Sequence, residues 1–413
     1  MTHTFFNIGK KQFLFLLIAF VSIQVACKKD SGGGNPVITH VAAVDSLHRD
    51  SFFTQALPGA LVHIIGDGFT GTTHIYFNDL EAPFNSALGS NTTLIVSIPA
   101  NTPTPATNPN VSNQVKVVTN HGTAIYSFTV VPPPPIVASV SNENALPGAT
   151  ITVKGTNFYS ITNVVFPGGV NGTNVTASSD GTQLTVTVPT LTKAGPLTVT
   201  GKYGSGSTVY PFNSVGAPTV GFQANFEWGD PYFGWQYWGG NNTNTGFPNN
   251  TGQFIEVHPS GAINAGDGSW YSDNRAVMVA GGSNWIASAS QDSITKYALK
   301  FELSINPSVP WTAGSFMIVP SGNFNYMARY APWETTTSGS FTTNGWVTVT
   351  IPLTKFLSGT GSYNAAGNQA PNIAALAGSG YNGTLQIMLF NDGTTTLKAF
   401  DGAVDNVRIV KYQ

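Results

Sequence analysis

The chain has 413 residues, only 9% of them charged, and its formal net charge is -2. At roughly 100 to 200 residues per domain, this length predicts about two to four domains. With so few Lys and Arg residues the chain offers no basic surface to phosphate groups, so nucleic acid is not expected as a partner. The 45 glycines and 26 prolines separate short runs of Val, Ile, Thr and Phe, which predicts an all-β chain.

The first residues are typical of an export signal. Lys10 and Lys11 precede the apolar stretch FLFLLIAFVSI, and Ala26 leads directly to Cys27. The apolar stretch is shorter than the roughly 20 residues that a membrane-spanning helix needs. Cys27 is the only cysteine, so the chain forms no internal disulfide, and a buried free thiol is the alternative role for this residue.

The position of Cys27 resembles a bacterial lipobox, in which cleavage of the signal leaves the cysteine as a lipidated N-terminus. Gln24 departs from that pattern, because a lipobox usually carries Leu or a similar residue there. We therefore predict a lipoprotein signal peptide over residues 1–26, followed over 27–36 by the lipidated cysteine and a glycine-rich tether.

Two copies of one β unit follow. The string ALPGA at residues 56–60 recurs at 145–149, an offset of 145 − 56 = 89, and the same offset pairs Gly66 with Gly155. We predict that the Pro of each string starts a turn and that the paired glycines permit a bulge or a positive φ. Phenylalanines with the same offset are predicted to lie in the core of each unit: Phe69, Phe77, Phe158 and Phe166.

Each copy reads as a small sandwich of short alternating strands. The order PG, then G-x-x-F, then a later hydrophobic residue before Pro resembles the immunoglobulin-like IPT/TIG domains. The predicted boundaries are 37–131 and 136–215, and the four prolines at 132–135 predict a stiff, extended linker between them. The two units are therefore expected to form a stalk.

The composition changes after residue 215, because all eight tryptophans lie beyond that point. Alternating segments predict strands at YALKFELSI, GSFMIVPS, NYMARYAP, GWVTVTIPL, GTLQIMLFND and AVDNVRIVKY, with two more near NFEW and RAVMVAG. These strands predict a larger β-sandwich of jelly-roll type over residues 216–413.

The aromatic residues of this region stand among Gly, Asn and Thr. A flat ring can cover the C–H face of a sugar while nearby amides and carboxylates hydrogen-bond its hydroxyls, so this neighbourhood favours carbohydrate binding. Trp346 opens an alternating strand and is predicted to be a core residue, and Trp228 and Trp311 are predicted to be core residues or loop anchors. The candidate glycan-binding residues are Trp235, Trp238, Tyr330, Trp333, Trp270 and Trp285.

The order of these parts resembles the surface glycan-binding proteins of Bacteroidota polysaccharide-utilisation systems. The likeness spans almost the whole chain, from the lipobox-like cysteine through the tandem TIG-like domains to YMARYAPWE, GWVTVTIPL and FDGAVDNVRIV. It implies a non-catalytic, lipid-anchored protein on the outer membrane surface that captures a β-glycan such as xyloglucan for uptake. It also implies an outer-membrane transporter and surface glycosidases as partners, and an aromatic platform for which the best candidates are Trp333, Tyr330, Trp235 and Trp238.

Two other functions stay open from the sequence. A jelly-roll glycoside hydrolase needs two carboxylates about 5 to 10 Å apart, whereas Glu256, Glu302 and Glu334 lie in separate segments. A protein-binding adhesin would also use surface Trp and Tyr residues. The polar neighbours of the aromatic residues favour glycan over a protein partner.

No catalytic residue and no cofactor is predicted. The sequence has no G-x-S-x-G element, no H-E-x-x-H helix and no cysteine cluster, which argues against a nucleophilic hydrolase and a zinc site. Asp401, Asp405 and Asn406 offer hard oxygen ligands for a structural Ca²⁺. A turn at the solvated end of a strand is the alternative interpretation of these three residues.

Overall fold

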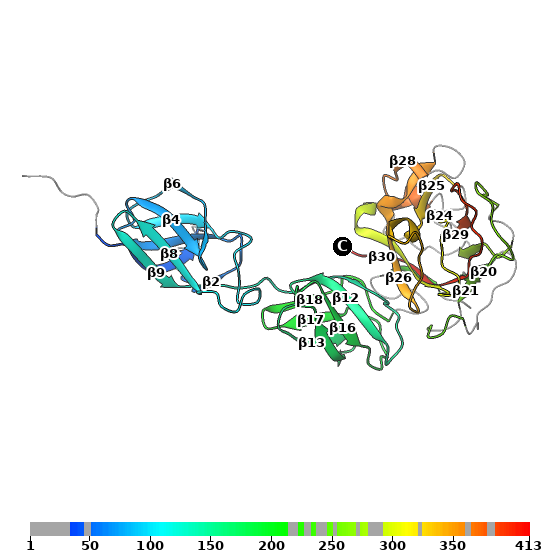
Figure 1. The fold of residues 1–413 in the computed structure, drawn as a ribbon, viewed down its shortest axis with the longest axis horizontal. Coiled ribbons are helices and arrows are strands. Elements are labelled where there is room, and N and C mark those ends of the chain that lie inside the picture. Colours follow the sequence, from blue (N-terminus) through cyan, green and yellow to red (C-terminus); the bar gives the residue numbers. More distant parts are fainter. Residues whose placement is uncertain are drawn as a thin grey trace, which may run out of the picture. The chain divides into compact units, whose positions relative to one another are not determined.

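Figure 1 shows the computed structural model, which describes residues 34–44, 51–213, 222–226, 233–236, 246–250, 254–269, 273–279, 292–320, 324–359, 365–377 and 385–413. The chain divides into two compact units, Met1–Pro133 and Pro134–Gln413, so the division falls within the predicted proline linker. Regular structure is almost entirely β-strand, which confirms the all-β prediction. No helix in the described ranges is long and apolar enough to cross a membrane.

The first unit holds the first repeat as a small antiparallel β-sandwich. One sheet has the order β1 (Val37–Ala43), β3 (Leu61–Asp67), β7 (Thr93–Ser97) and β6 (Phe84–Gly89). The other has the order β5 (Leu80–Glu81), β4 (Thr72–Phe77), β8 (Gln114–Thr119) and β9 (Gly122–Ser127), and β2 (Gln55–Ala56) pairs in parallel with β10 (Thr129–Val130). Phe69 and Phe77 are buried in its core, as predicted.

The second repeat, at the start of the second unit, has the same plan. Its sheets are β11 (Ile136–Val140), β12 (Thr150–Thr156), β16 (Gln183–Thr187) and β15 (Thr173–Ala177), and β14 (Val170–Asn171), β13 (Ile161–Phe166), β17 (Thr198–Gly201) and β18 (Gly204–Ser207). Phe158 and Phe166 are buried in its core, as predicted. In Figure 1 this repeat is drawn in green shades around the labels β12, β16 and β17.

The PG strings form the predicted turns. Gly59 and Gly148 have φ of 83° and 88°, the left-handed value that the third residue of a type II turn needs after Pro. The amide of Ala60 donates to the carbonyl of Leu57 at 3.2 Å, and the amide of Ala149 donates to Leu146 at 3.1 Å. The two repeats therefore close their first turns in the same way.

For Gly66 and Gly155 the sequence predicted either a bulge or a positive φ. Neither glycine has a positive φ. Each stands where the partner strand has a register shift, which agrees with the predicted bulge. A Cβ at Gly66 would lie 1.9 Å from the carbonyl oxygen of Val37, and one at Gly155 would lie 2.0 Å from that of Ile136. Close approach of the neighbouring backbone therefore requires glycine at both positions.

The C-terminal domain is a sandwich of two antiparallel sheets. The five-stranded sheet contains β19 (Phe222–Phe226), β30 (Gly402–Lys411), β23 (Tyr297–Ile305) and β26 (Val347–Pro352), with β21 (Ile255–Val257) also paired to β30. The seven-stranded sheet has the order β20 (Phe233–Gln236), β22 (Ala276–Val279), β29 (Leu385–Phe390), β24 (Ser315–Pro320), β25 (Tyr326–Tyr330), β27 (Leu357–Gly359) and β28 (Ala365–Gln369). All eight predicted strands are present.

Short helical segments connect these strands. They are the 3₁₀ turns η2 (Ile294–Lys296), η3 (Pro332–Thr335) and η4 (Leu353–Lys355), and the single α-helical turn α2 (Ile373–Ala377). The segment η3 follows β25 directly and carries Trp333. It begins at Pro332, whose fixed φ suits the first position of a helical turn.

Between the two sheets lies the main core of the C-terminal domain. Trp311 is fully buried there, its Nε1–H donates to the carbonyl of Ala313 at 2.7 Å, and its ring packs against Phe316 and Phe400. Trp346 is buried in a separate small cluster and packs against Phe254. The prediction that Trp346 is a core residue is confirmed, and Trp311 is core rather than a loop anchor.

Tyr297, at the start of β23, predicts a pH effect on stability. Its hydroxyl donates to the carboxylate of Asp292 at 2.5 Å. Burial is the larger cause and this hydrogen bond the smaller cause that together raise the pKa of Tyr297 to about 12. The unfolded chain loses the proton near pH 10, so the contribution to stability is complete below about pH 10 and is lost as the pH rises toward about 12. Tyr297→Phe does not ionise, so we expect the wild type to lose stability relative to this variant in urea titrations between about pH 9 and about pH 11. Parallel behaviour of the two proteins would contradict the assignment.

Candidate functional site

The seven-stranded sheet of the C-terminal domain buries side chains on both of its faces. Along β24, Phe316 and Ile318 belong to the main core, whereas Met317 and Val319 belong to a second apolar group on the opposite face. We call this group the outer cluster; its members are Ala276, Met317, Val319, Met327, Met388 and Phe390. Side chains alternate between faces along a strand, so the outer cluster marks the face of this sheet that points away from the main core.

Trp235 lies on the edge strand of this sheet. Its backbone stands opposite Met278, Met278 stands opposite Gln386, and Gln386 stands opposite Val319. This row of backbone positions joins the edge strand to Val319 of the outer cluster. The side chain of Trp235 lies outside the described residues.

Tyr330 belongs to the opposite face of the same sheet. It pairs with Phe316 of the main core, and its ring packs edge-on against Phe301 and Trp311, with centroid distances of 6.2 and 6.1 Å. This burial raises the pKa of the Tyr330 hydroxyl above its ordinary range. Tyr330 is only partly exposed, so the structure brings it to the rim of the main core and not onto the outer face.

Trp333 lies on η3 with its ring partly buried against the main core. Its Nε1–H donates to the carbonyl of Gly314 at 2.8 Å, just before β24 begins. With the polar edge of the indole held in this way, the ring has a fixed position and part of its surface stays exposed. A ring fixed before binding loses little conformational entropy when a ligand stacks on it.

An ion-pair clamp around Arg329 holds η3 against the sheet. The guanidinium donates to both carboxylate oxygens of Glu334, at 2.7 and 2.8 Å, and its Nε–H donates to Asp392 at 2.5 Å. Ser315 supports the clamp by donating to Asp392 at 2.8 Å. The hydrogen bonds to Glu334 make the largest contribution to raising the pKa of Arg329. The bonds to Asp392 also raise it, whereas burial lowers it. Both oxygens of the Glu334 carboxylate are therefore held in place by Arg329.

The three glutamates weighed for glycoside hydrolysis have distinct surroundings. Glu302 is 2% exposed and accepts two hydrogen bonds from Arg408, at 2.7 and 3.0 Å. Glu334 is clamped by Arg329, as described above. Glu256 lies in β21, next to His258 and Asp401.

Glu256, His258 and Asp401 form the group of side chains in the described residues that could hold a metal ion. Their ligand atoms lie within 4.8 Å of one another, and His258 Nδ1 lies 3.1 Å from the Asp401 carboxylate. The side-chain amide of Asn306 also donates to the Asp401 carboxylate, at 2.7 Å. Asp405, one of the other predicted Ca²⁺ ligands, is not in this group, and Ca²⁺ binding by Asp401 stays a prediction.

Several predicted site residues lie outside the described residues. They are Trp238, Trp270 and Trp285 among the glycan-binding candidates, Trp228 among the predicted core residues, and Cys27, the predicted lipidation site. Their proposed roles therefore stay sequence predictions.

The C-terminal domain is similar to a family of known proteins. Residues 219–411 match the family model described as surface glycan-binding protein B xyloglucan binding domain. A curated relative, an IPT/TIG domain-containing protein from Bacteroides ovatus, is 31% identical over 147 residues. This match covers 35% of the chain and 30% of the relative, so it spans less than a third of that protein.

Solved structures resemble the chain over most of its length. The surface glycan-binding protein PbSGBP-B from Prevotella bryantii has a TM-score of 0.65 and 22% identity, over 92% of this chain and 100% of that chain. The SGBP-B from a complex xyloglucan utilization locus in Bacteroides uniformis has a TM-score of 0.49 and 18% identity, over 92% and 100% of the two chains. The likeness to the Prevotella protein shows a shared fold.

Proposed function

We propose, from the membership of residues 219–411 in the xyloglucan-binding-domain family of surface glycan-binding protein B, that this chain captures a β-glycan of the xyloglucan class. The family match is the observation that carries the proposal. The proposed mechanism is binding without bond cleavage: aromatic rings stack on successive sugar units, and neighbouring amides and carboxylates hydrogen-bond the hydroxyls.

The proposed platform includes Trp333 and Trp235, joined by Trp238, Trp270 and Trp285 from the sequence argument. Trp333 has the strongest structural support among them, because its ring is partly exposed and its position is fixed by Gly314 and by the clamp on Glu334. Tyr330 is proposed as a contact at the margin of this surface, since much of its ring packs against the main core.

The absence of catalysis is part of the proposal. Glu302 and Glu334 are each paired with an arginine, and Glu302 is also buried. Glu256 and Asp401 are one pair of described carboxylates that lie close enough together to test. We expect no release of reducing sugar from xyloglucan by the wild type. Release that disappears in Glu256→Gln would instead establish a hydrolase.

Replacing Trp333 by Ala is expected to weaken glycan binding. Loss of one stacking ring costs about 1 kcal/mol, which corresponds to roughly a fivefold weaker Kd. The measurement is affinity electrophoresis of the full chain in gels with xyloglucan, mixed-linkage glucan, xylan, galactomannan or no polysaccharide.

Phe52→Ala is the matched control, because Phe52 is an exposed aromatic residue of the first repeat. We expect this variant to migrate like the wild type in every gel. Equal retardation of Trp333→Ala and wild type would remove Trp333 from the platform. A folded wild type that no gel retards would favour a protein-binding adhesin.

The proposed location is the outer membrane surface, with Cys27 as the lipid anchor and an outer-membrane transporter and surface glycosidases as partners. The cell surface agrees with the family of the C-terminal domain. The anchor is supported by the position of the single cysteine behind the apolar stretch. Cys27→Ala is expected to release the protein from the membrane fraction, and its retention there would contradict lipidation.

A further inference from the structure

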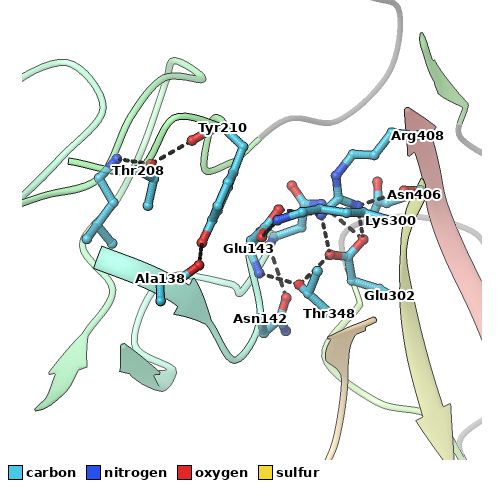
Figure 2. Close-up of polar contacts among 12 residues, drawn as sticks. Ala138, Asn142, Glu143, Thr208, Tyr210, Lys300, Glu302, Thr348, Asn406 and Arg408 are labelled. Atoms are coloured by element: carbon cyan, nitrogen blue, oxygen red, sulfur yellow. Dashed lines mark hydrogen bonds and ion pairs between the residues drawn. The ribbon is translucent and has the colours of Figure 1, made fainter. Parts of the chain in front are cut away.

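Part of the outer face of the five-stranded sheet is buried by the second repeat. Along β23, Leu299, Phe301 and Leu303 face the main core, whereas Lys300 and Glu302 face the other way. Lys300 and Glu302 are nonetheless only 1% and 2% exposed. Figure 2 shows why: Lys300 and Arg408 of β30 meet Glu143, which follows β11 in the second repeat, and Glu302 pairs with Arg408.

Glu143 is the centre of this network. One of its carboxylate oxygens pairs with the Nζ of Lys300, and the other accepts from Arg408 at 2.7 Å. Arg408 also donates to Glu302, and Asn144 of the second repeat donates to Glu302 at 3.2 Å. Two carboxylates therefore balance two cations, and one carboxylate comes from the second repeat while the other comes from the C-terminal domain.

The surroundings of Lys300 also come from the second repeat. Its Nζ lies 3.2 Å from the centre of the Tyr210 ring, which is 3% exposed. A cation held this close to a ring face in a desolvated place is attracted more strongly than one at the surface. Without the second repeat, Lys300 would lose both this ring and the carboxylate of Glu143.

Backbone and apolar contacts cross the same boundary. The amide of Thr348 in β26 donates to the carbonyl of Ser141 at 2.8 Å, and the amide of Glu143 donates to the Thr348 hydroxyl at 2.8 Å. In β30, Ile409 belongs to the main core, whereas Val410 belongs to the core of the second repeat. One strand thus supplies side chains to two hydrophobic cores.

We propose that the second repeat and the C-terminal domain are a single cooperative folding unit, held together by the buried network of Glu143, Lys300, Glu302 and Arg408. The network is electrically balanced and desolvated only when both domains are folded and joined, because separation leaves Glu143 on one side and both cations on the other. The second repeat is then part of the body that carries the candidate glycan site, rather than an independent segment of a stalk.

The test is native-state hydrogen exchange of the full chain in low concentrations of urea, followed by mass spectrometry. Peptides from β16 report on the second repeat and peptides from β29 report on the seven-stranded sheet, and neither strand supplies a residue to the network. We expect both peptides to exchange through one opening with the same urea dependence. In Glu143→Gln, which removes the charge and keeps the size, both are expected to exchange roughly tenfold faster or more.

Glu81→Gln is the matched control, since Glu81 is an exposed carboxylate of the first repeat that pairs with His74. It is expected to leave both peptides unchanged. If Glu143→Gln does not fold, Asn144→Ala gives the same comparison, because it removes one bond to Glu302 and no charge. Different urea dependences for β16 and β29 in the wild type, or an effect confined to β16, would overturn the proposal.

Discussion

Arg408→Met is expected to lower the free energy of unfolding of the second unit by about 3–5 kcal/mol, the usual cost of removing one partner from a buried ion pair. Arg408 is 1% exposed and donates to both Glu143 and Glu302. Its loss leaves two buried carboxylates with Lys300 as the remaining cation of the network. The unfolded chain solvates both carboxylates freely, so the penalty falls on the folded state alone.

Urea unfolding followed by tryptophan fluorescence measures this effect cleanly, because all eight tryptophans lie beyond residue 215. Arg329→Met is the control: Arg329 is also paired with two carboxylates, but its side chain is 33% exposed. Partly exposed ion pairs contribute little, so this variant is expected to lose about 1 kcal/mol or less. Equal losses in the two variants would show that burial of the network contributes no additional stability.

A double variant tests whether Arg408→Met destabilises the protein because it leaves a buried carboxylate unpaired or because the attraction of the ion pair is lost. Adding Glu302→Met to Arg408→Met removes one of the carboxylates that the single variant leaves behind, and Glu143 keeps Lys300 as its partner. We therefore expect the double variant to regain part of the lost stability. A further loss of stability in the double variant would argue against the unpaired carboxylate as the cause.

Local sequence patterns predicted the repeats and the strands, because those depend on neighbours in sequence. The offset of 89 residues is matched by two sandwiches with the same PG turn and the same close approach at Gly66 and Gly155. For residues 219–411, the resemblance to surface glycan-binding proteins is confirmed by the match to the family model. The sequence did not separate bulge from positive φ at these glycines, since the distance to a neighbouring strand is a property of the folded sheet.

The position of Tyr330 could have been inferred more closely from its own strand. Alternation along β25 places Tyr326, Ala328 and Tyr330 on one face and Met327 and Arg329 on the other. The cluster of Arg329, Tyr330, Trp333 and Glu334 in the sequence favoured a surface role. Strand alternation is the signal that would have favoured the core face.

The interface network could not be predicted from the sequence. Alternation along β23 points Glu302 away from Leu303, but an outward residue in one domain is normally solvated. The partner Glu143 lies 157 residues from Lys300 and 265 residues from Arg408 in the chain. No local pattern joins residues that far apart, so only the folded structure shows that this outward face is covered.

Trp311→Ala is expected to destabilise the C-terminal domain by about 3–5 kcal/mol, the range for truncating a fully buried Trp. Its ring is 0% exposed and contacts Phe316 and Phe400, so Ala leaves a cavity between the two sheets and leaves the Ala313 carbonyl without its donor. Trp333→Ala removes a ring that is only partly buried, and we expect it to cost under about 2 kcal/mol. Urea unfolding of both variants measures the difference.

The same two variants separate a core tryptophan from a platform tryptophan. Under conditions where each remains folded, Trp311→Ala is expected to bind xyloglucan like the wild type, because its ring has no exposed surface to offer a sugar. Trp333→Ala is expected to bind more weakly while keeping most of its stability. The opposite pattern, with Trp333→Ala strongly destabilised and its folded fraction binding normally, would make Trp333 a core residue and leave the tryptophans of other segments to form the platform.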